Sequence, residues 1–240
     1  PLGRIRSVAT ALNNAEKVVI LAGGGVRRAE ATLQKLAEML DAPVILTANA
    51  RGAMHGHRLC VPASPSLPSV RNLIASADQI LAIGTELGPT DYDVYAKGGV
   101  PDLSDMIRID ICADQLARHP AKLPIKADAG PMMAALLPMM LPANRNGAAR
   151  AEATRNAARA ELPGLSPAMP GQLEIVEAIR KSTPNAIIVG DSTQPVYAGN
   201  LYYDHDRPGG WFNAATGYGA LGYAPGAAVG AAIAAPGTPV

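Results

Sequence analysis

The amino-acid sequence predicts an α/β fold, in which a doubly wound parallel sheet is followed by the first part of a second α/β unit. Short, continuous apolar runs recur along the chain, and segments with helical periodicity lie between them. Strands that are buried on both faces of a parallel sheet have such continuous apolar sequences. Because parallel strands are connected by helices, the alternation predicts a sheet with helices on both faces.

The first 141 residues contain the elements of one such sheet. Apolar runs predict strands over residues 17–22, 43–47, 79–84, 105–111 and 123–127. Apolar residues at helical spacing predict helices over residues 9–15, 28–40, 70–76 and 132–141. We therefore expect residues 1–141 to form one central domain.

The composition changes after residue 141. Residues 142–167 are rich in Ala, Arg, Asn and Glu, and they predict a mostly exposed linker helix that is broken by residues 163–167. From residue 168 a second α/β unit begins. Its predicted elements are a helix over 172–181 with Leu173, Val176 and Ile179 on one face, strands over 185–190 and near 211–213, and a helix from about 222. These elements are too few to bury a core, so residues 168–240 are expected to be the N-terminal part of an incomplete domain.

Composition excludes several classes of function. The net charge is +1 and no basic run occurs, which argues against binding to nucleic acid or to a membrane surface. No apolar run reaches the roughly 18–20 residues that span a bilayer. The two cysteines form neither a disulfide framework nor a metal-ligand spacing, so a reducing cytoplasm is expected. The chain starts with neither a signal peptide nor an initiator Met, which suggests a piece of a longer protein.

A run of three glycines, Gly23–Gly25, follows the first predicted strand and precedes a helix. Ligands bind at this place in open α/β sheets, and a helix N-terminus there attracts phosphate. The run departs from G-x-G-x-x-G, because Val26, Arg27 and Arg28 come next, and no acidic residue ends the second strand. The residues alone leave open a nucleotide-binding loop or a tight turn between strand and helix.

Other polar residues near strand ends are weaker candidates. Asp110 could reach a ribose hydroxyl or cap a turn, and Asp191 could act as an acid, a base or a cap. His55 and His57 have no third ligand nearby in the sequence, so we do not predict a metal site there. No Ser/His/Asp or Cys/His arrangement indicates nucleophilic catalysis.

The most distinctive stretch covers residues 211–230. It opens on Trp211 and Phe212, has glycines at 217, 219 and 222, and continues into an Ala-rich helix. Glycines allow the backbone to approach a ligand closely. The small apolar residues that follow predict a helix packed tightly against a sheet or another helix. The pattern also fits a glycine-rich turn before a buried helix.

These segments together resemble the thiamine diphosphate-dependent enzymes of the acetolactate synthase and 2-oxoacid decarboxylase family. The resemblance covers nearly the whole chain, and its most specific part is the segment 217–223. The glycine run, residues 47–52 and residues 109–111 are similar to the family's Rossmann-like central domain. Residues 191–197 are closest to 5-guanidino-2-oxopentanoate decarboxylases. The resemblance implies a cytoplasmic homodimer or homotetramer that acts on a small-molecule 2-oxoacid.

The resemblance implies roles for individual residues. The Gly219 carbonyl would accept a hydrogen bond from the exocyclic amine of the cofactor's aminopyrimidine. The Leu221 side chain would be a wedge under thiamine diphosphate, which holds the thiazolium C2 toward that amine. The wider cofactor site would contain Asp191, Ser192, Thr193, Gly217 and Ala220, whereas the cleft that binds FAD or ADP in some members would contain Gly24, Gly25, Asp110 and Asp128.

The chain also departs from the family pattern. Cys112 replaces the second Asp of Asp-Ile-Asp, Pro225-Gly226 stands where Leu-Pro is usual, and residues 84–88 lack the Arg that contacts flavin. We therefore expect weak or no binding of FAD or ADP. The family's catalytic Glu lies in an N-terminal domain, and its Mg²⁺-binding motif would begin after Val240, so this chain alone is expected to be inactive. Two other functions stay open: a non-catalytic adenine-nucleotide module and a dimerisation module.

Overall fold

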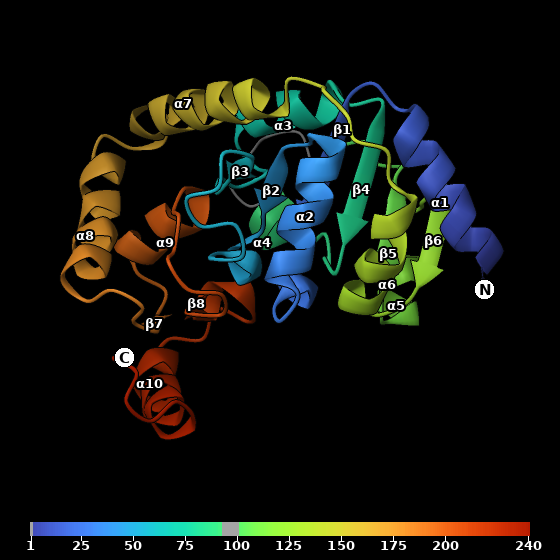
Figure 1. Cartoon of the computed structure of the whole chain (residues 1–240). Coiled ribbons are helices and arrows are strands. Elements are labelled where there is room, and N and C mark those ends of the chain that lie inside the picture. The colour runs from blue at the N-terminus through green and yellow to red at the C-terminus, as the bar shows by residue number, and fades with distance from the viewer. Residues whose placement is uncertain (1, 93–100) are drawn as a thin grey trace.

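A six-stranded parallel sheet forms the centre of the protein, in a computed structural model that describes residues 2–92 and 101–240 (Figure 1). The strand order is β3-β2-β1-β4-β5-β6. The order reverses between β1 and β4, as in a doubly wound sheet, which confirms the predicted fold class. The strands are β1 (Val18–Ala22), β2 (Val44–Leu46), β3 (Cys60–Val61), β4 (Gln79–Ile83), β5 (Ile107–Asp110) and β6 (Leu123–Lys126).

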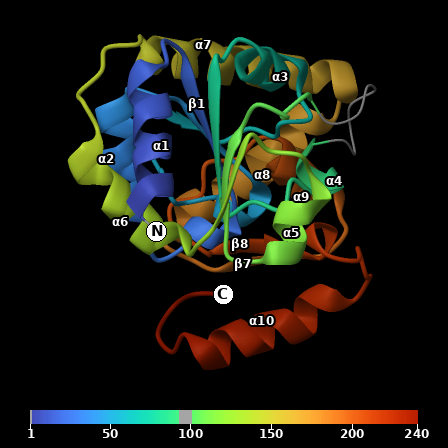
Figure 2. The same ribbon diagram turned by 90° about the vertical axis from the view of Figure 1, so that its right-hand side faces the viewer.

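Helices cover both faces of this sheet (Figure 2). The helices α1 (Leu2–Asn14), α2 (Glu30–Leu40) and α6 (Ala129–Leu136) pack on one face, and α3 (Pro68–Ala75) packs on the other. The side chains of β1 alternate between the two layers: Ile20 lies in the core under α2, and Leu21 in the core under α3. Because both sets are fully buried, the strand is apolar throughout.

Several short elements of this part were not predicted. Strand β3 is only two residues long, and α4 (Pro89–Tyr92) and α5 (Ala113–Arg118) are too short to show a helical period. The predicted helix over 9–15 begins much earlier, at Leu2. The predicted helix over 132–141 is shorter, because α6 ends at Leu136 and a 3-10 turn follows.

The segment predicted as an exposed linker is a helix with a buried face. Helix α7 (Gly147–Leu165) crosses the top of the molecule in Figure 1 and contacts α3 and β3. Ala151, Ala158 and Leu162 are buried there, because small residues at helical spacing let α7 approach α3 closely. The helix ends at Leu165, within the predicted break at residues 163–167, and Pro163 lies in its last turn. The predicted helix and its end within residues 163–167 therefore agree with the structure, whereas its buried face was not predicted.

The second unit has two parallel strands, β7 (Ile188–Gly190) and β8 (Trp211–Asn213), and three helices, α8 (Met169–Ser182), α9 (Gln194–Leu201) and α10 (Tyr223–Ala234). Helix α8 packs along α9. Leu173 and Val176 are buried as predicted, but Ile179 is 45% exposed, because α9 covers only part of the predicted apolar face. Helix α9 lies between the two strands and was not predicted.

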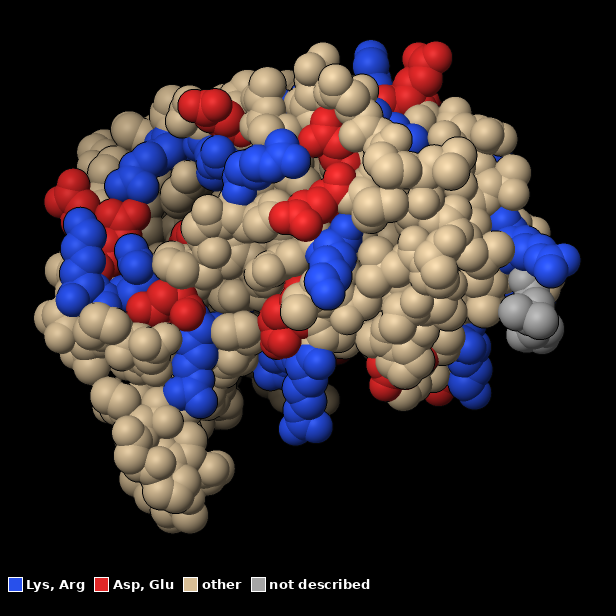
Figure 3. Space-filling view, viewed as in Figure 1, with Lys and Arg blue, Asp and Glu red and all other residues tan. Residues whose placement is uncertain are grey.

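Helix α10 was expected to pack tightly, but no residue of it is buried. It projects from the lower side of the molecule and bears no charged side chain (Figures 1 and 3). Val229 is 62% exposed and Ile233 is 75% exposed. A helix that is apolar all round is typical of buried positions. The described residues, however, cover α10 only near β7, so most of its surface lacks a packing partner.

Candidate functional site: a glycine-rich cleft and the segment beside it

The glycine run lies at the reversal point of the sheet. The Gly25 amide donates to the Gly84 carbonyl over 3.0 Å, which joins the loop after β1 to the end of β4. Gly84 has a φ of +55°, and a Cβ there would overlap the backbone of Gly25. Glycine is thus required for this close approach. The carboxyl ends of the strands form an open edge beside this contact, and ligands bind at that edge in doubly wound sheets.

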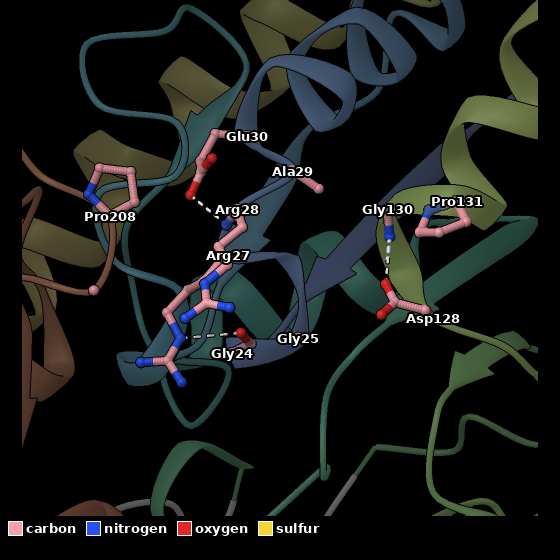
Figure 4. A pocket seen from close by; sticks show the side chains of 11 residues that line it. Gly24, Gly25, Arg27, Arg28, Ala29, Glu30, Asp128, Gly130, Pro131 and Pro208 are labelled. Carbon is pink, nitrogen blue, oxygen red and sulfur yellow. Dashed lines mark hydrogen bonds between the residues drawn. The ribbon is translucent and has the colours of Figure 1, made fainter.

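The predicted cleft residues of the central domain gather at this edge. A cavity of about 680 Å³ is lined by Gly24, Gly25 and Asp128, together with Arg27 (Figure 4). An adjoining cavity of about 380 Å³ is lined by Gly25, Asp110 and Asp128. The prediction that these residues share one region therefore agrees with their positions.

Both carboxylates of the cleft already accept backbone hydrogen bonds. Asp110 Oδ1 accepts from the Cys112 amide over 2.8 Å, and Asp128 Oδ1 accepts from the Gly130 amide over 3.0 Å at the start of α6 (Figure 4). Both side chains thus act as caps of the following turn. The arrangement leaves their second oxygens for other partners.

A third cavity, of about 530 Å³, lies between the central domain and the second unit. Thr47, Thr90 and Asp91 line it from the central domain, and Gly217 and Tyr218 from the second unit. Burial raises the pKa of Asp91 to about 6, although the Ala48 amide, which donates to its Oδ1 over 2.8 Å, and the charge of Arg51 oppose this shift. No sequence pattern marks Asp91, because its raised pKa depends on burial in the folded chain.

Asp191 holds the start of α10. Its Oδ1 accepts from the Ser192 amide over 2.8 Å, and its Oδ2 accepts from the amides of Gly222 and Ala224 over 2.8 Å and 3.3 Å. The hydrogen bond from the Ser192 amide, together with those from the amides at the start of α10, lowers the pKa of the Asp191 carboxyl. Thr193 precedes α9, where its side chain makes no cap hydrogen bond. Of the three roles open for Asp191, the structure shows the cap.

The segment 217–221 lies on the surface beside these residues. Gly219 has a φ of +67°, and its carbonyl accepts from Ser192 Oγ over 3.2 Å. Leu221 is 81% exposed. Ser192, Gly217, Gly219 and Leu221 line a cavity of about 500 Å³. Ala220 and Gly217 line another, of about 230 Å³. The structure thus brings together the predicted residues of the second unit, apart from Asp191 and Thr193, at open cavities.

The histidines do not converge on one point. His55 Nδ1 lies 3.0 Å from Asp204 Oδ2, and His57 Nε2 lies 3.1 Å from Glu38 Oε1. Within residues 2–92 and 101–240, no group of three or more His, Cys, Asp or Glu side chains is placed to hold a metal ion. In the same described part of the chain, no helix has the length and apolar character needed to cross a membrane.

Comparison with protein families gives two matches. The family described as "Thiamine pyrophosphate enzyme, central domain" matches residues 5–136, which is more than half of the chain. The family described as "Thiamine pyrophosphate enzyme, C-terminal TPP binding domain" matches residues 191–240. The first match covers the six-stranded sheet, and the second covers Asp191 and the segment 217–221.

Individual relatives agree with these matches. The chain is 31% identical to the probable 2-ketoarginine decarboxylase AruI of Pseudomonas aeruginosa, over 98% of this chain and 42% of that protein. It is 29% identical to an acetolactate synthase of Mycobacterium bovis, over 99% of this chain and 40% of that protein. The chain therefore spans about two fifths of the length of these relatives.

A solved structure shows the same fold. The thiamine diphosphate-dependent 4-hydroxybenzoylformate decarboxylase of Rhodococcus jostii superposes with a TM-score of 0.71 at 22% identity, over 98% of this chain and 44% of that one. This likeness supports the fold, and the family follows from the sequence matches. Taken with the glycine-rich edge and the segment 217–221, they show that the chain belongs to the thiamine pyrophosphate enzymes.

Proposed function

We propose that this chain is part of a thiamine diphosphate-dependent enzyme that decarboxylates or ligates 2-oxoacids. The observation that carries the proposal is the exposed segment 217–221, in which the Gly219 carbonyl and the Leu221 side chain border a cavity of about 500 Å³. An exposed Leu beside a backbone with positive φ has no packing role in the described structure. A ligand that covers Leu221 would give it one.

The residues present fit an aminopyrimidine. The Gly219 carbonyl has a second lone pair beside the one that Ser192 Oγ occupies, so it can accept from an exocyclic amine. The open side of Gly219 has no atom closer than Ser192 Oγ, at 3.9 Å from an added Cβ. The backbone is thus accessible to a flat ring, as the proposal requires.

The proposal assigns different work to the cofactor and to the chain. Thiamine diphosphate, when bound, supplies the electron sink for the carbon–carbon bond cleavage of a 2-oxoacid. The Leu221 side chain would supply bulk against the bound cofactor, and the Gly219 carbonyl would hold its exocyclic amine. Positioning of this kind lowers the barrier by orientation rather than by new chemistry.

We place the diphosphate end near residues 191–193. The hydroxyls of Ser192 and Thr193 are donors for phosphate oxygens. The Asp191 carboxylate already accepts three backbone amides, so in this proposal it holds the segment in place rather than binding Mg²⁺ itself. Mg²⁺ then accompanies the diphosphate, as the resemblance to the family implies.

The names of two relatives support the proposed substrate class. One is a probable 2-ketoarginine decarboxylase and another an acetolactate synthase, and both names describe reactions of 2-oxoacids. 2-Ketoarginine is 5-guanidino-2-oxopentanoate, the substrate that residues 191–197 suggested from the sequence. We propose a 2-oxoacid of this class, a cytoplasmic location and a homodimer or homotetramer.

Adenine-nucleotide binding is a second candidate function. It is favoured by the glycine-lined cavity of about 680 Å³, in which Arg27 is available for a phosphate. The absence of an acidic residue after β2 and the departures at Cys112 and residues 84–88 speak against tight binding. We expect FAD and ADP to bind more weakly than about 1 µM, if they bind at all.

Calorimetric titration of the native protein tests both candidates. Thiamine diphosphate with Mg²⁺ is expected to bind at one site per chain, and titrations with FAD and ADP are expected to give little heat. The proposal fails if thiamine diphosphate does not bind. Sub-micromolar binding of FAD without binding of thiamine diphosphate would favour the nucleotide module instead.

A further inference from the structure

Two hydrogen bonds hold the peptide groups of Ala215, two residues before the segment 217–221. Its amide donates to Asn213 Oδ1 over 3.1 Å, and its carbonyl accepts from Thr90 Oγ1 over 2.8 Å. Ala215 begins no strand and lies within a short 3-10 turn. The segment that follows is exposed and glycine-rich. Its own amides at Gly217 and Gly219 donate to the Ala214 carbonyl over 3.0 Å and 2.9 Å, so the two bonds at Ala215 hold the turn from which the segment starts.

The first support comes from the central domain. Thr90 belongs to α4, which is attached to the sheet edge on two sides. Asp91 Oδ1 accepts from the Ala48 amide over 2.8 Å, and the Asp91 carbonyl accepts from Ser64 Oγ over 2.7 Å. The neighbouring Tyr92 is fully buried. Thr90 therefore belongs to a part of the central domain that is anchored by hydrogen bonds and by a buried side chain.

The second support is a buried pair of amide side chains. Asn200 Nδ2 donates to Asn213 Oδ1 over 3.1 Å, and Asn213 Nδ2 donates back to Asn200 Oδ1 over 2.9 Å. Trp211 Nε1 also donates to Asn200 Oδ1, over 3.1 Å. All three side chains are at most 3% exposed. These hydrogen bonds fix the orientation of the Asn213 side chain, whose Oδ1 also accepts from the Ala215 amide.

Arg51 connects this pair to the central domain. Its guanidinium donates to the carbonyls of Asn200 over 2.9 Å and of Tyr203 over 2.7 Å, and also to the carbonyl of Pro62. Arg51 is 1% exposed, and burial lowers the pKa of its guanidinium. The planar guanidinium of Arg, with its several N–H groups, is better suited to donate to three carbonyls than the ammonium group of Lys. Arg51 thus fixes the backbone that carries Asn200.

We infer that the central domain sets the position of the segment 217–221 through Ala215, with Thr90 as the direct positioning residue and Arg51 acting through Asn200. The role of that segment in cofactor binding rests on the proposed function, whereas the restraint on Ala215 does not. The inference gives the central domain a part in the cofactor site in addition to its own cleft. It predicts that loss of one hydroxyl in α4 loosens a segment in the second unit.

The test compares three variants of the native protein. Thr90→Val removes the hydroxyl and keeps the shape, and Thr90→Ser keeps the hydroxyl. The control is Thr154→Val, because Thr154 Oγ1 likewise donates to a backbone carbonyl, that of Arg150 within α7, over 2.8 Å. Thr154 is buried and Thr90 is half-buried, so the control also covers the loss of a more shielded hydroxyl. Backbone hydrogen exchange of residues 214–222 is measured by mass spectrometry without thiamine diphosphate.

We expect Thr90→Val to raise the exchange rate of residues 214–222 about two- to tenfold, the size of one lost hydrogen bond. Thr90→Ser and Thr154→Val are expected to exchange as the wild type does. Unchanged exchange in Thr90→Val would overturn the inference. An equal rise in Thr154→Val would also overturn it, since the effect would then be one of general stability.

A second readout separates this inference from the proposed function. If the wild type binds thiamine diphosphate, Thr90→Val is expected to raise its dissociation constant by a similar factor, and Thr90→Ser to restore it. Faster exchange with unchanged cofactor affinity would overturn the positioning role. If the wild type does not bind thiamine diphosphate, the proposed function fails, and the exchange data alone decide whether Thr90 restrains the segment.

Discussion

Asp91 shows how burial gives a residue a property that its sequence context does not reveal. Its folded-state pKa of about 6 lies above the model-peptide value of 3.8, because burial disfavours the charged form. The folded state therefore binds more protons than the unfolded state between these values. The stability that Asp91 contributes is present below pH 3.8 and is lost as the pH rises through 6.

The variant Asp91→Asn tests the direction of this dependence of stability on pH. The variant keeps an acceptor for the Ala48 amide and removes the ionisation. We expect the free energy of unfolding of the wild type, relative to Asp91→Asn, to fall by up to about 3 kcal/mol between pH 4 and pH 7. Urea denaturation at both pH values measures the difference. A difference that does not change with pH would show that Asp91 titrates normally.

Leu221 is the residue for which sequence and structure together give the sharpest expectation. The resemblance implied a wedge under the cofactor, and the structure places the side chain at 81% exposure beside a cavity. A residue so exposed contributes little to packing, so removal of its side chain leaves no large cavity in the protein. The stability of the protein without cofactor should thus depend little on Leu221.

At the scale of elements, the loop after β2 connects the two units. Gly52 has a φ of +91°, and a Cβ there would overlap the Arg207 carbonyl. Further along the same chain, the Ser64 amide donates to the Leu201 carbonyl at the end of α9 over 2.8 Å. Glycine at 52 thus satisfies both an unusual backbone conformation and a close approach.

Gly52→Ala is expected to lower the free energy of unfolding by about 2–4 kcal/mol, because it adds backbone strain and an overlap. Gly56→Ala is the matched control. Gly56 has a φ of +65°, but no atom lies within 4 Å of an added Cβ, so only the strain applies. We expect a loss of about 1 kcal/mol there. Equal losses in urea denaturation would contradict a close contact between the two units at Gly52.

The long elements could be predicted from the sequence, and the short ones could not. β1 and β4 are continuous apolar runs, and α2 has a clear helical stripe, so their pattern is sufficient. β3 and α4 are too short to show a period. The exposure of α10 could not be predicted, because an apolar sequence says that a helix can be buried but does not say what covers it.

The candidate site was predictable to a similar degree. The glycine run and the segment 217–221 could be identified because glycines and family resemblance mark them. Thr90 and Arg51 could not be identified, since each acts through carbonyls that are distant in the sequence. Hydrogen bonds from a side chain to a remote backbone group leave no local pattern. Only the folded chain shows them.

At the scale of the whole molecule, the main feature is that the central domain and the second unit contact each other. Arg51, Gly52 and Thr90 of the central domain contact residues of the second unit, and α7 packs against α3 and β3 instead of lying free. The boundaries at residues 141 and 167 stay predictions. These contacts agree with our inference that both units position the segment 217–221. A thiamine diphosphate site in this protein would therefore depend on the central domain as well.

The exchange rate of the C2 proton of thiamine diphosphate, bound to the native protein at saturating cofactor, tests the central claim most directly. We expect Leu221→Ala to slow it on the order of a hundredfold, because even about 1 Å of misplacement has an effect of that size. Leu221→Met, which roughly conserves volume, should exchange nearly as the wild type does. Exchange at the wild-type rate in Leu221→Ala would contradict the wedge role and leave the segment 217–221 as only a glycine-rich turn.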